Sequence, residues 1–529
     1  MNNWGIIMTE LSFPSKILVL LFAILIFTGC SDFNKVTREV GNKDSFQKAA
    51  YENNGELEIK SPYLKIHMKS GSVYILHDWQ YNDSSAAGEG CLLNEYRDTL
   101  LSNGKFNVGY DSVSLFETNI IKPSGSQNAM TIFTGITAAV TVACITNPKA
   151  CFGSCPTFYV EDSQGFHLRA EGFSSSISPS LEAADIDALH CEANAGDDFF
   201  LDMKNEALET HVVGSADLIA VPKDKNSRVF ADNDGKFWES KVQMSPDYAE
   251  SEEGNALKLT KSFDGKEWYS KADSNYLGTK EIMELEFNNI PEQQCGLVIG
   301  CRQTLLSTYL IYQSFAYMGN DVGYWFAQIE RQKFKLSRYP IAEIIGGIEV
   351  LTQDSTGEWK VSGIIDEQGP LAVDLHLIHL KMNTSKNLKV RLRMTKGNWR
   401  IDYIALALNL KKVEPIYIKP YSVLKDGNTD KSALDKLCDS TKVLTTLPGD
   451  IYTLNYKIPA ISNMYELFLK SRGYYLEWIR RGWIKEENQT YIWQILFDPK
   501  AALTRLAPEF KAVEESMEKS FWRSRYAKP

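Results

Sequence analysis

The sequence lacks the short motifs that identify the common classes of enzyme. It contains no Gly-x-Ser-x-Gly nucleophile elbow, no Walker phosphate-binding loop, no dinucleotide-binding glycine pattern and no His-Glu-x-x-His zinc motif. A single Ser-x-x-Lys match, Ser516 to Lys519, lies in an amphipathic stretch that is typical of a packing helix. These absences favour a non-enzymatic protein, so we predict no catalytic residue and no cofactor.

Positive charge is also scarce. The chain has 57 Lys and Arg residues against 67 Asp and Glu residues, which gives a net charge of −10. Nucleic-acid-binding proteins usually present a basic face, so we expect no nucleic-acid partner. The densest basic segment, Lys389 to Arg400, alternates its charges with Val390 and Leu392. This pattern predicts a strand with one solvated and one buried face; a surface for acidic ligands is the alternative.

Long apolar runs are missing too, because no run reaches the roughly 20 residues that a membrane-spanning helix needs. The first apolar run, Ile17 to Phe27, follows Lys16 and leads into Thr28-Gly29-Cys30. A basic residue, a short apolar stretch and small residues before a cysteine resemble a bacterial lipoprotein signal. We therefore predict that residues 1–29 are a signal peptide and that Cys30 is lipidated.

This signal predicts the location of the protein. Several acyl chains on one cysteine would hold the protein firmly on a membrane, because each buried methylene contributes about 0.8 kcal/mol. We expect a membrane-anchored lipoprotein of the cell envelope, with the outer membrane favoured. Phe27 stands where lipoprotein signals prefer an aliphatic residue, so an uncleaved membrane anchor is the alternative. Residues 30–56 are polar and predict a flexible tether.

The remaining cysteines favour disulfide bonds in an exported protein. Cys151 and Cys155 are the predicted local partners, with Cys144 and Cys191 as alternative partners for them. Cys151-x-x-x-Cys155-Pro156 also resembles the thiol motif of copper-delivering proteins, so Cu(I) binding at this pair is a second possibility. Cys295 and Cys301 bracket a segment typical of a buried strand. Six extended residues span about 20 Å, far beyond disulfide reach, so we predict two buried free thiols.

The middle of the chain predicts separate β-rich modules. Short β-type runs over residues 57–122 indicate a small β-barrel or sheet. Residues 123–150 predict an apolar helical segment, because Met130 to Ile145 is uncharged and has small residues four apart. For that segment, dipping into a membrane and forming a strand pair are the alternatives. Residues 151–236 predict a second β module that opens with a hairpin at Thr157–Val160 and Phe166–Ala170.

The second half predicts a β-sandwich over residues 237–420, with one helix at Arg302 to Met318. Residues 421–450 have the composition of a polar connection within a last region, 421–529. That region predicts a strand pair, with a break at Gly473, and then C-terminal helices. The final helix begins at Asp498-Pro499, with Asp as its N-cap and Pro in its first turn. The predicted fold class is therefore mainly β, multidomain, with a C-terminal helical segment.

The most individual polar motif runs from Asn205 to His211. Asn205, Glu206, Glu209 and His211 are our candidate binding edge. Their spacing matches no zinc motif, and capping and turn roles are the structural alternative, so we predict no metal site. Asp185, Asp187 and His190 likewise match no zinc motif, and we expect structural roles for them. His376 and His379 are three apart in a predicted strand and should point to opposite faces.

Several stretches resemble a group of uncharacterised bacterial envelope lipoproteins. They are Cys151 to Tyr159, Ala170 to Phe173 with Ser176 to Pro179, Asn205 to His211, Trp399 to Tyr403 and Ser471 to Trp478. This resemblance covers most of the chain after Cys30. It implies an envelope location and carries no known activity.

The expected function is a lipid-anchored scaffold or adaptor of a surface assembly, with an envelope protein as its partner. A glycan-binding sandwich is one alternative, with candidate stacking rings at Trp238, Trp268, Trp325, Trp359 and Trp399. Burial of these rings would count against it. A thiol or copper-binding protein acting through Cys151 and Cys155 is the other alternative.

Overall fold

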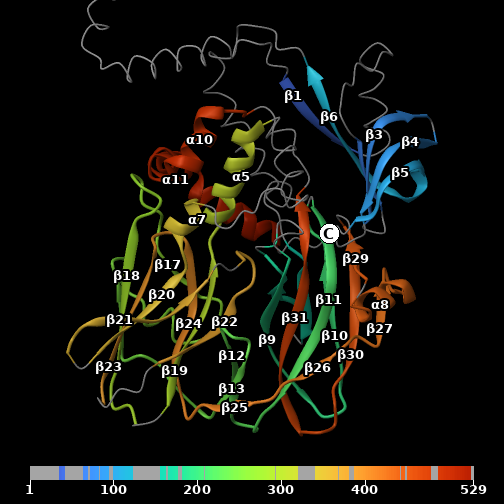
Figure 1. Cartoon of the computed structure of the whole chain (residues 1–529). Coiled ribbons are helices and arrows are strands. Elements are labelled where there is room, and N and C mark those ends of the chain that lie inside the picture. Colours follow the sequence, from blue (N-terminus) through green and yellow to red (C-terminus); the bar gives the residue numbers. More distant parts are fainter. Residues whose placement is uncertain are drawn as a thin grey trace, which may run out of the picture.

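The structure is a computed structural model, and the statements below concern only the parts of the chain that it describes. These are residues 35–41, 64–68, 72–82, 84–93, 99–122, 155–162, 165–174, 176, 182–207, 209–291, 294–319, 340–354, 356–366, 369–380, 386–440, 442–446, 449–477 and 486–525. They form five sheets, almost entirely antiparallel, and a group of helices (Figure 1). The predicted mainly β, multidomain class with C-terminal helices is confirmed.

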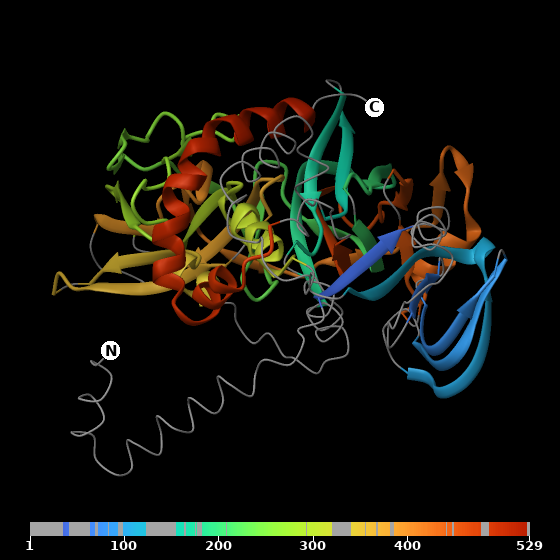
Figure 2. The same ribbon diagram turned by 90° about the horizontal axis from the view of Figure 1, so that it is seen from above.

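The N-terminal sheet stands to one side of the other four in both views (Figures 1 and 2). Its strands follow the order β1-β6-β2-β3-β4-β5, so β1 and β5 are open edges and the described strands do not close into a barrel. Leu64, Ile66, Leu76 and Phe116 form its core. The strands are β1 (Lys35–Gly41), β2 (Leu64–Met68), β3 (Val73–Tyr81), β4 (Ser85–Leu93), β5 (Thr99–Gly109) and β6 (Val113–Lys122), with the short helix η1 (Tyr110–Ser112) before β6.

The predicted tether needs a correction, because β1 lies inside it. Lys35 is the Cα partner of Lys122 and Gly41 that of Phe116, so β1 pairs with β6 along its whole length. The partner strand lies about 80 residues further along the chain, so the local sequence of residues 30–56 gives no sign of this pairing.

Two further sheets pack face to face as the first sandwich. Phe158 and Leu201 come from one sheet and Leu218 and Leu467 from the other, and they share one core. One sheet has the order β28-β27-β30-β10-β7-β8, and the other has β26-β11-β31-β9 with β29 beside β11. The strands are β7 (Thr157–Asp162), β8 (Gly165–Glu171), β9 (Ala183–Asn194), β10 (Asp198–Lys204), β11 (Glu209–Pro222), β26 (Ile416–Ile418), β27 (Ser422–Lys425), β28 (Asn428–Thr429), β29 (Leu444–Thr446), β30 (Ile451–Lys457) and β31 (Met464–Glu477).

The second sandwich is built from the last two sheets. Leu285 and Leu392 face Ile299 and Leu406 across its core. One sheet has the order β14-β24-β19-β22-β12-β13-β25 with β17 beside β24, and the other has β16-β15-β18-β23-β20-β21. The strands are β12 (Arg228–Asp232), β13 (Phe237–Ser240), β14 (Val242–Met244), β15 (Tyr248–Ser251), β16 (Gly254–Asn255), β17 (Trp268–Tyr269), β18 (Lys280–Phe287), β19 (Cys295–Gln303), β20 (Ile348–Gln353), β21 (Trp359–Ile365), β22 (Asp374–His379), β23 (Leu388–Thr395), β24 (Trp399–Leu408) and β25 (Lys411–Val413).

The two sandwiches pack against each other, which makes a stack of four sheets. Ile219 and Phe468 of the first sandwich meet Phe230, Phe237 and Leu377 of the second in a separate buried cluster. Alternate residues of β11 divide between the two cores, since Leu218 belongs to the core of the first sandwich and Ile219 to this cluster. We call this contact between the inner sheets the junction.

The predicted domain boundaries at 236/237 and 420/421 are wrong. The chain leaves the first sandwich after β11, builds the second, and returns at β26. The strands predicted as a separate C-terminal pair lie inside the first sandwich, where β30 pairs with β10 and β31 lies between β11 and β9. The second sandwich is therefore an insertion. Strands some 250 residues apart leave no local pattern of their pairing. The two parts of the first sandwich were therefore predicted as two separate modules.

Four helices gather at one end of the stack (Figure 1), and from above α11 crosses over the second sandwich (Figure 2). They are α5 (Leu306–Met318), α7 (Pro340–Ile345), α10 (Gln489–Phe497) and α11 (Pro499–Arg525). Leu306, Leu310 and Leu503 belong to their shared core. The predicted cap of α11 is confirmed, because the amide of Ala501 donates to Asp498 Oδ1 over 3.1 Å. No helix in the described part of the chain is both long enough and apolar enough to span a membrane.

Several other local predictions were wrong. Residues 421–450 are not a plain connection, since they contain β27, β28, β29 and the helix α8 (Lys431–Cys438). Its N-cap Asp430 accepts a bond from the amide of Ala433, a pattern that could have been found. β31 also runs unbroken through Gly473, where a Cβ would lie 2.3 Å from the carbonyl oxygen of Val212. Glycine there permits close strand approach and does not end the strand. The predicted helical segment 123–150 lies outside the described residues.

Candidate functional site

The candidate binding edge and several of the segments singled out in the sequence meet at one end of the first sandwich. Residues 205–208 link β10 in one sheet directly to β11 in the other. In β11, Glu209 is the partner of Glu477 and His211 is the partner of Tyr475, so the ends of β11 and β31 lie side by side. Cys155 precedes β7, whose Thr157 pairs with Lys204 of β10. We call this group of residues the polar corner.

Asn205 is the anchor of the polar corner. Its side chain is almost fully buried, and its Nδ2 donates to the carbonyl oxygens of Glu209, at 3.0 Å, and Thr446, at 3.2 Å. Its own amide donates to the carbonyl of Asp450, and its carbonyl accepts from the amide of Gly449. Asn205 therefore bonds to three separate backbone segments and holds the crossing from one sheet to the other.

Glu206 bonds toward β7. Its Oε2 accepts from Thr157 Oγ1 at 2.9 Å and from the Tyr159 hydroxyl at 2.7 Å. Lys204 lies over the Tyr159 ring, with its Nζ 4.4 Å from the ring centre. The Glu206 carboxylate thus fixes two side chains of a neighbouring strand, which is a positioning role within the fold.

Glu209 and His211 form a fully buried pair. His211 Nε2 lies 3.1 Å from Glu209 Oε2, and neither side chain is exposed. The His211 ring also meets the Tyr475 ring edge to face, with centroids 6.5 Å apart. A glutamate that orients a histidine is an arrangement found in catalytic sites, but here both partners lie inside the sandwich, and contact with substrate would require the corner to open.

The polar corner extends to the helices and to the segment before β9. The Tyr312 hydroxyl of α5 donates to Glu477 Oε1 over 2.6 Å. The Tyr475 hydroxyl donates to the carbonyl of Ser174 at 3.1 Å, and its amide donates to the carbonyl of Ser176. Burial, followed by the nearby Cys155 and Glu209, raises the pKa of the Tyr475 hydroxyl well above its usual value. The Tyr475 hydroxyl is therefore neutral and acts as a donor at neutral pH.

Cys155 is a buried free thiol at the edge of this corner. Burial raises the pKa of its thiol well above the usual value, and the negative charges of Glu171 and Glu209 raise it further. A thiol held protonated is a poor nucleophile and a poor metal ligand. Its predicted partner Cys151 lies outside the described residues, as do Cys144 and Cys30. The predicted disulfide is therefore not seen, and the predicted lipidation stays a prediction.

The other candidate ligands are not arranged as a metal site in the described part of the chain. Among the described residues no group of three or more His, Cys, Asp or Glu side chains is placed to hold a metal ion. His376 lies 3.4 Å from Asp374 and His379 lies 3.2 Å from Asp232, so the two histidines have different partners, as their spacing predicted. Cys295 and Cys301 are buried free thiols in β19, which confirms that prediction.

The tryptophans proposed for glycan stacking do not line one surface. Trp268 and Trp399 are buried in the core of the second sandwich. Trp238 is partly buried, with its Nε1 donating to Asp232 Oδ2 at 2.7 Å, and Trp359 lies under the Arg391 guanidinium at 4.1 Å. Trp325 lies outside the described residues. These positions remove the tryptophan argument for a glycan groove.

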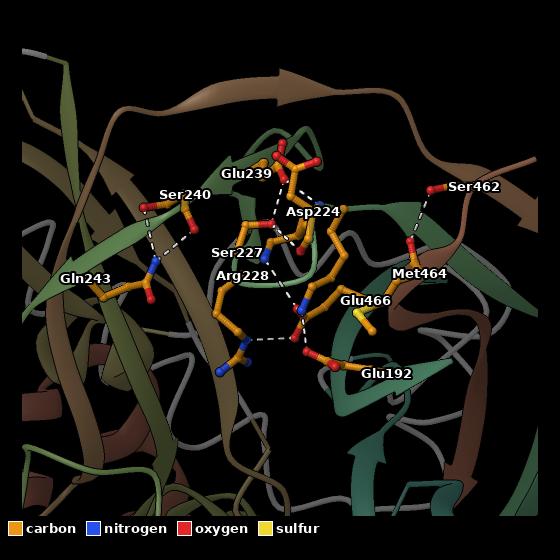
Figure 3. Close-up of polar contacts among 12 residues, drawn as sticks. Glu192, Asp224, Ser227, Arg228, Glu239, Ser240, Gln243, Ser462, Met464 and Glu466 are labelled. Atoms are coloured by element: carbon orange, nitrogen blue, oxygen red, sulfur yellow. Dashed lines mark hydrogen bonds and ion pairs between the residues drawn. The ribbon is translucent and has the colours of Figure 1, made fainter. Parts of the chain in front are cut away.

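Sequence analysis missed a buried charge cluster at the far end of the junction, shown in Figure 3. Lys223 is almost fully buried and forms ion pairs with Glu192 and with Glu466, the latter at 3.1 Å. Arg228 Nε donates to the other oxygen of Glu466 at 2.9 Å. We call Glu192, Lys223, Arg228 and Glu466 the paired end. These residues are far apart in the chain, so no spacing rule could have connected them.

The same figure shows how the paired end continues into the second sandwich. Glu239 Oε1 of β13 accepts from the amide of Asp224 at 2.8 Å and from the Ser227 hydroxyl at 2.5 Å. The chain crosses from one sandwich to the other at residues 223–227, so these bonds fix the crossing. The paired end therefore holds the two sandwiches together.

No protein-family profile and no curated protein matches this chain.

Proposed function

We propose that this protein is a lipid-anchored, non-catalytic protein of the cell envelope that serves as a scaffold or adaptor in a surface assembly. The lipoprotein-type signal ending at Cys30 supports the location. The main support for the scaffold role is the bonding of the polar corner. There, Asn205, Glu206 and Glu477 form hydrogen bonds with segments of both sheets and with a helix. Polar groups engaged in this way stabilise a rigid architecture that can hold partners in place.

The test compares the full chain with a Cys30→Ala variant in intact envelopes. We expect the parent protein to incorporate a radiolabelled fatty acid and to crosslink to a defined membrane protein, and we expect the variant to do neither. A parent protein that takes up no lipid would overturn the anchoring. A lipidated protein that captures no partner would overturn the scaffold role and leave the anchoring intact.

A glycan-binding role is the second candidate, and exposed aromatic rings on the first sandwich favour it. Phe166, Phe200 and Tyr421 are each about half exposed, at 51%, 45% and 55%. Phe200 is the Cα partner of Asn455, and the Tyr421 hydroxyl lies 3.4 Å from Asp198 Oδ1. Planar rings beside hydrogen-bonding groups can stack on sugar rings. A Phe200→Ala variant should lose signal on a glycan array, with Val361→Ala on the second sandwich as the control. An array without any signal for the parent protein would exclude this role.

Thiol or copper chemistry through Cys151 and Cys155 is the weakest of the three proposals, because the raised pKa of Cys155 disfavours its thiolate. A Cys151→Ser, Cys155→Ser double variant that binds Cu(I) as the parent does would exclude it.

A further inference from the structure

The junction has a second polar end, made of acids. Glu171 lies on β8, Asp185 and Asp187 lie on β9, and Asp374 lies on β22, so three sheets contribute. Along β31 the partner of Asp185 is Ser471 and the partner of Glu192 is Glu466, which places this end about 17 Å from the paired end at roughly 3.3 Å per residue. We call these four carboxyl groups the acidic end.

The carboxyl groups of the acidic end connect the two sandwiches through backbone amides. Glu171 Oε2, in the first sandwich, accepts from the amide of Leu371 in the second at 2.8 Å. Asp374 Oδ1, in the second sandwich, accepts from the amide of Ala188 in the first, also at 2.8 Å. Two hydrogen bonds in opposite directions therefore cross the junction here, and each depends on a carboxyl oxygen.

Asp187 is the least satisfied member of the acidic end. Its side chain is 5% exposed, and its Oδ2 is buried without a hydrogen-bond partner among the described residues. Within the described part of the chain no Lys or Arg forms an ion pair with Glu171, Asp185, Asp187 or Asp374. His376 Nε2 lies 3.4 Å from Asp374 Oδ2. A proton on a carboxyl group removes the cost of burying its charge.

The surrounding basic groups do not replace that proton. The Arg302 guanidinium lies near Glu171 but binds the Glu267 carboxylate and the carbonyl of Pro370. His190 adopts a left-handed backbone at φ 54°, and its Nε2 lies 2.9 Å from the carbonyl of Val373. Burial lowers the pKa of His190 to about 3, with Arg169 and Arg228 adding to the effect, so its ring is neutral.

We infer that the acidic end is a proton-binding site that controls how firmly the two sandwiches hold together. Protons bound there allow four buried carboxyl groups to share a small space, and their release leaves like charges facing each other across the junction. The junction is then firmest under mildly acidic conditions and loosens as the pH rises. This inference does not depend on lipid anchoring or on a scaffold role.

The direction of the effect follows from the individual groups. Burial raises the pKa of Glu171 from 4.5 to about 7 and that of Asp185 from 3.8 to about 6, and it raises the pKa of Asp187 well above its usual value. The folded state therefore binds more protons than the unfolded state between about pH 4 and 7. Their contribution is fully present below the ordinary pKa values and is lost as the pH rises through the raised ones. The lowered pKa of His190 makes stability rise with pH, which opposes the effect of Glu171, Asp185 and Asp187. The three carboxyl groups outnumber this one histidine.

The test is the amide hydrogen exchange of the full chain at about pH 5.5 and about pH 7.5, expressed as protection relative to an unfolded peptide. We expect the protection of the Ala188 and Leu371 amides to fall as the pH rises. The Val229 amide, which donates to Glu466 Oε2 at the paired end over 3.4 Å, is the internal control and should keep its protection. An equal change at all three amides would overturn the inference.

A matched pair of variants separates the two ends. Asp187→Asn mimics the protonated acid and should weaken the pH dependence of unfolding by about one proton. Glu192→Gln at the paired end should leave that dependence unchanged. Glu281 also has a pKa raised to about 7 by burial, so the difference between each variant and the parent is the decisive quantity. An Asp187→Asn protein with the full pH dependence of the parent would contradict the inference; should this variant not fold, the exchange measurement on the parent still decides.

Discussion

The two ends of the junction handle buried carboxyl groups in different ways. At the paired end, Glu466 lies between Lys223 and Arg228, so its charge is compensated by two cations. At the acidic end, Glu171 and Asp187 accept hydrogen bonds from backbone amides and have no cation paired with them, and burial raises the pKa of both carboxyl groups. Buried carboxyl groups are therefore paired with cations at one end of the junction, whereas at the other end they lack cations and burial raises their pKa. The junction therefore contains ion pairs at the paired end and buried carboxyl groups with raised pKa values at the acidic end.

Removing the buried cation should have the largest effect. Lys223→Ala leaves Glu466 buried with only Arg228 beside it, and breaking a buried pair in this way costs about 3 kcal/mol or more. The free energy of unfolding from urea titrations measures the loss. Lys225→Ala changes the same residue type at an exposed position two residues away and should cost less than about 0.5 kcal/mol. Equal losses in the two variants would remove the distinction between the ends.

Neutralising an acid at the acidic end should have the opposite sign. Glu171→Gln can still accept a bond from the Leu371 amide, and it carries no charge. Because burial raises the pKa of Glu171 from 4.5 to about 7, the variant should gain about 3 kcal/mol at pH 8 and less than about 1 kcal/mol at pH 5. Urea unfolding at the two pH values measures the gain. A loss of stability at pH 8 would show that the charged form of Glu171 is the favoured one.

The outer cation of the paired end should matter less than the inner one. Arg228 has 40% of its side chain exposed, and Glu466 keeps Lys223 when Arg228 is removed. We expect Arg228→Ala to cost about 1 kcal/mol. A double-mutant cycle with Lys223→Ala should show coupling, since both cations bind the same carboxylate. Strict additivity of the two losses would argue against a shared pair.

A surface pair should show the smallest effect. Arg391 Nε donates to Glu284 Oε1 over 2.8 Å on the exposed face of β18 and β23. Exposed pairs contribute less than about 1 kcal/mol, and salt screens them. Arg391→Ala should therefore change stability slightly in low salt and hardly at all in 1 M salt. A larger loss would point to the stacking of Arg391 on Trp359, which Arg391→Lys would also weaken.

Strand content was predictable because alternation of apolar and polar residues is local. The alternation of charged residues with Val390 and Leu392 predicted a strand with one solvated and one buried face, and β23 confirms it. The N-cap of α11 was equally local.

The candidate site was half predictable. The Asn205 to His211 motif was recognised as unusual, and the structure places it at a crossing between sheets, with Glu209 and His211 fully buried. What the motif bonds to could not be predicted, because Thr446 and Tyr475 come from strands more than 200 residues later. A polar motif has the same appearance in sequence whether it faces solvent or a neighbouring sheet.

The sequence alone determined the local properties of this protein: a signal-like start with Cys30, an acidic composition, the positions of most strands and the cap of the last helix. Tertiary structure decided that β31 completes a sandwich begun at β7, that Lys223 meets Glu466, and that Glu171 and Asp374 reach across one junction. The physical reason is that periodicity and capping act over a few residues, whereas charge compensation and strand pairing depend on which distant segments are buried together.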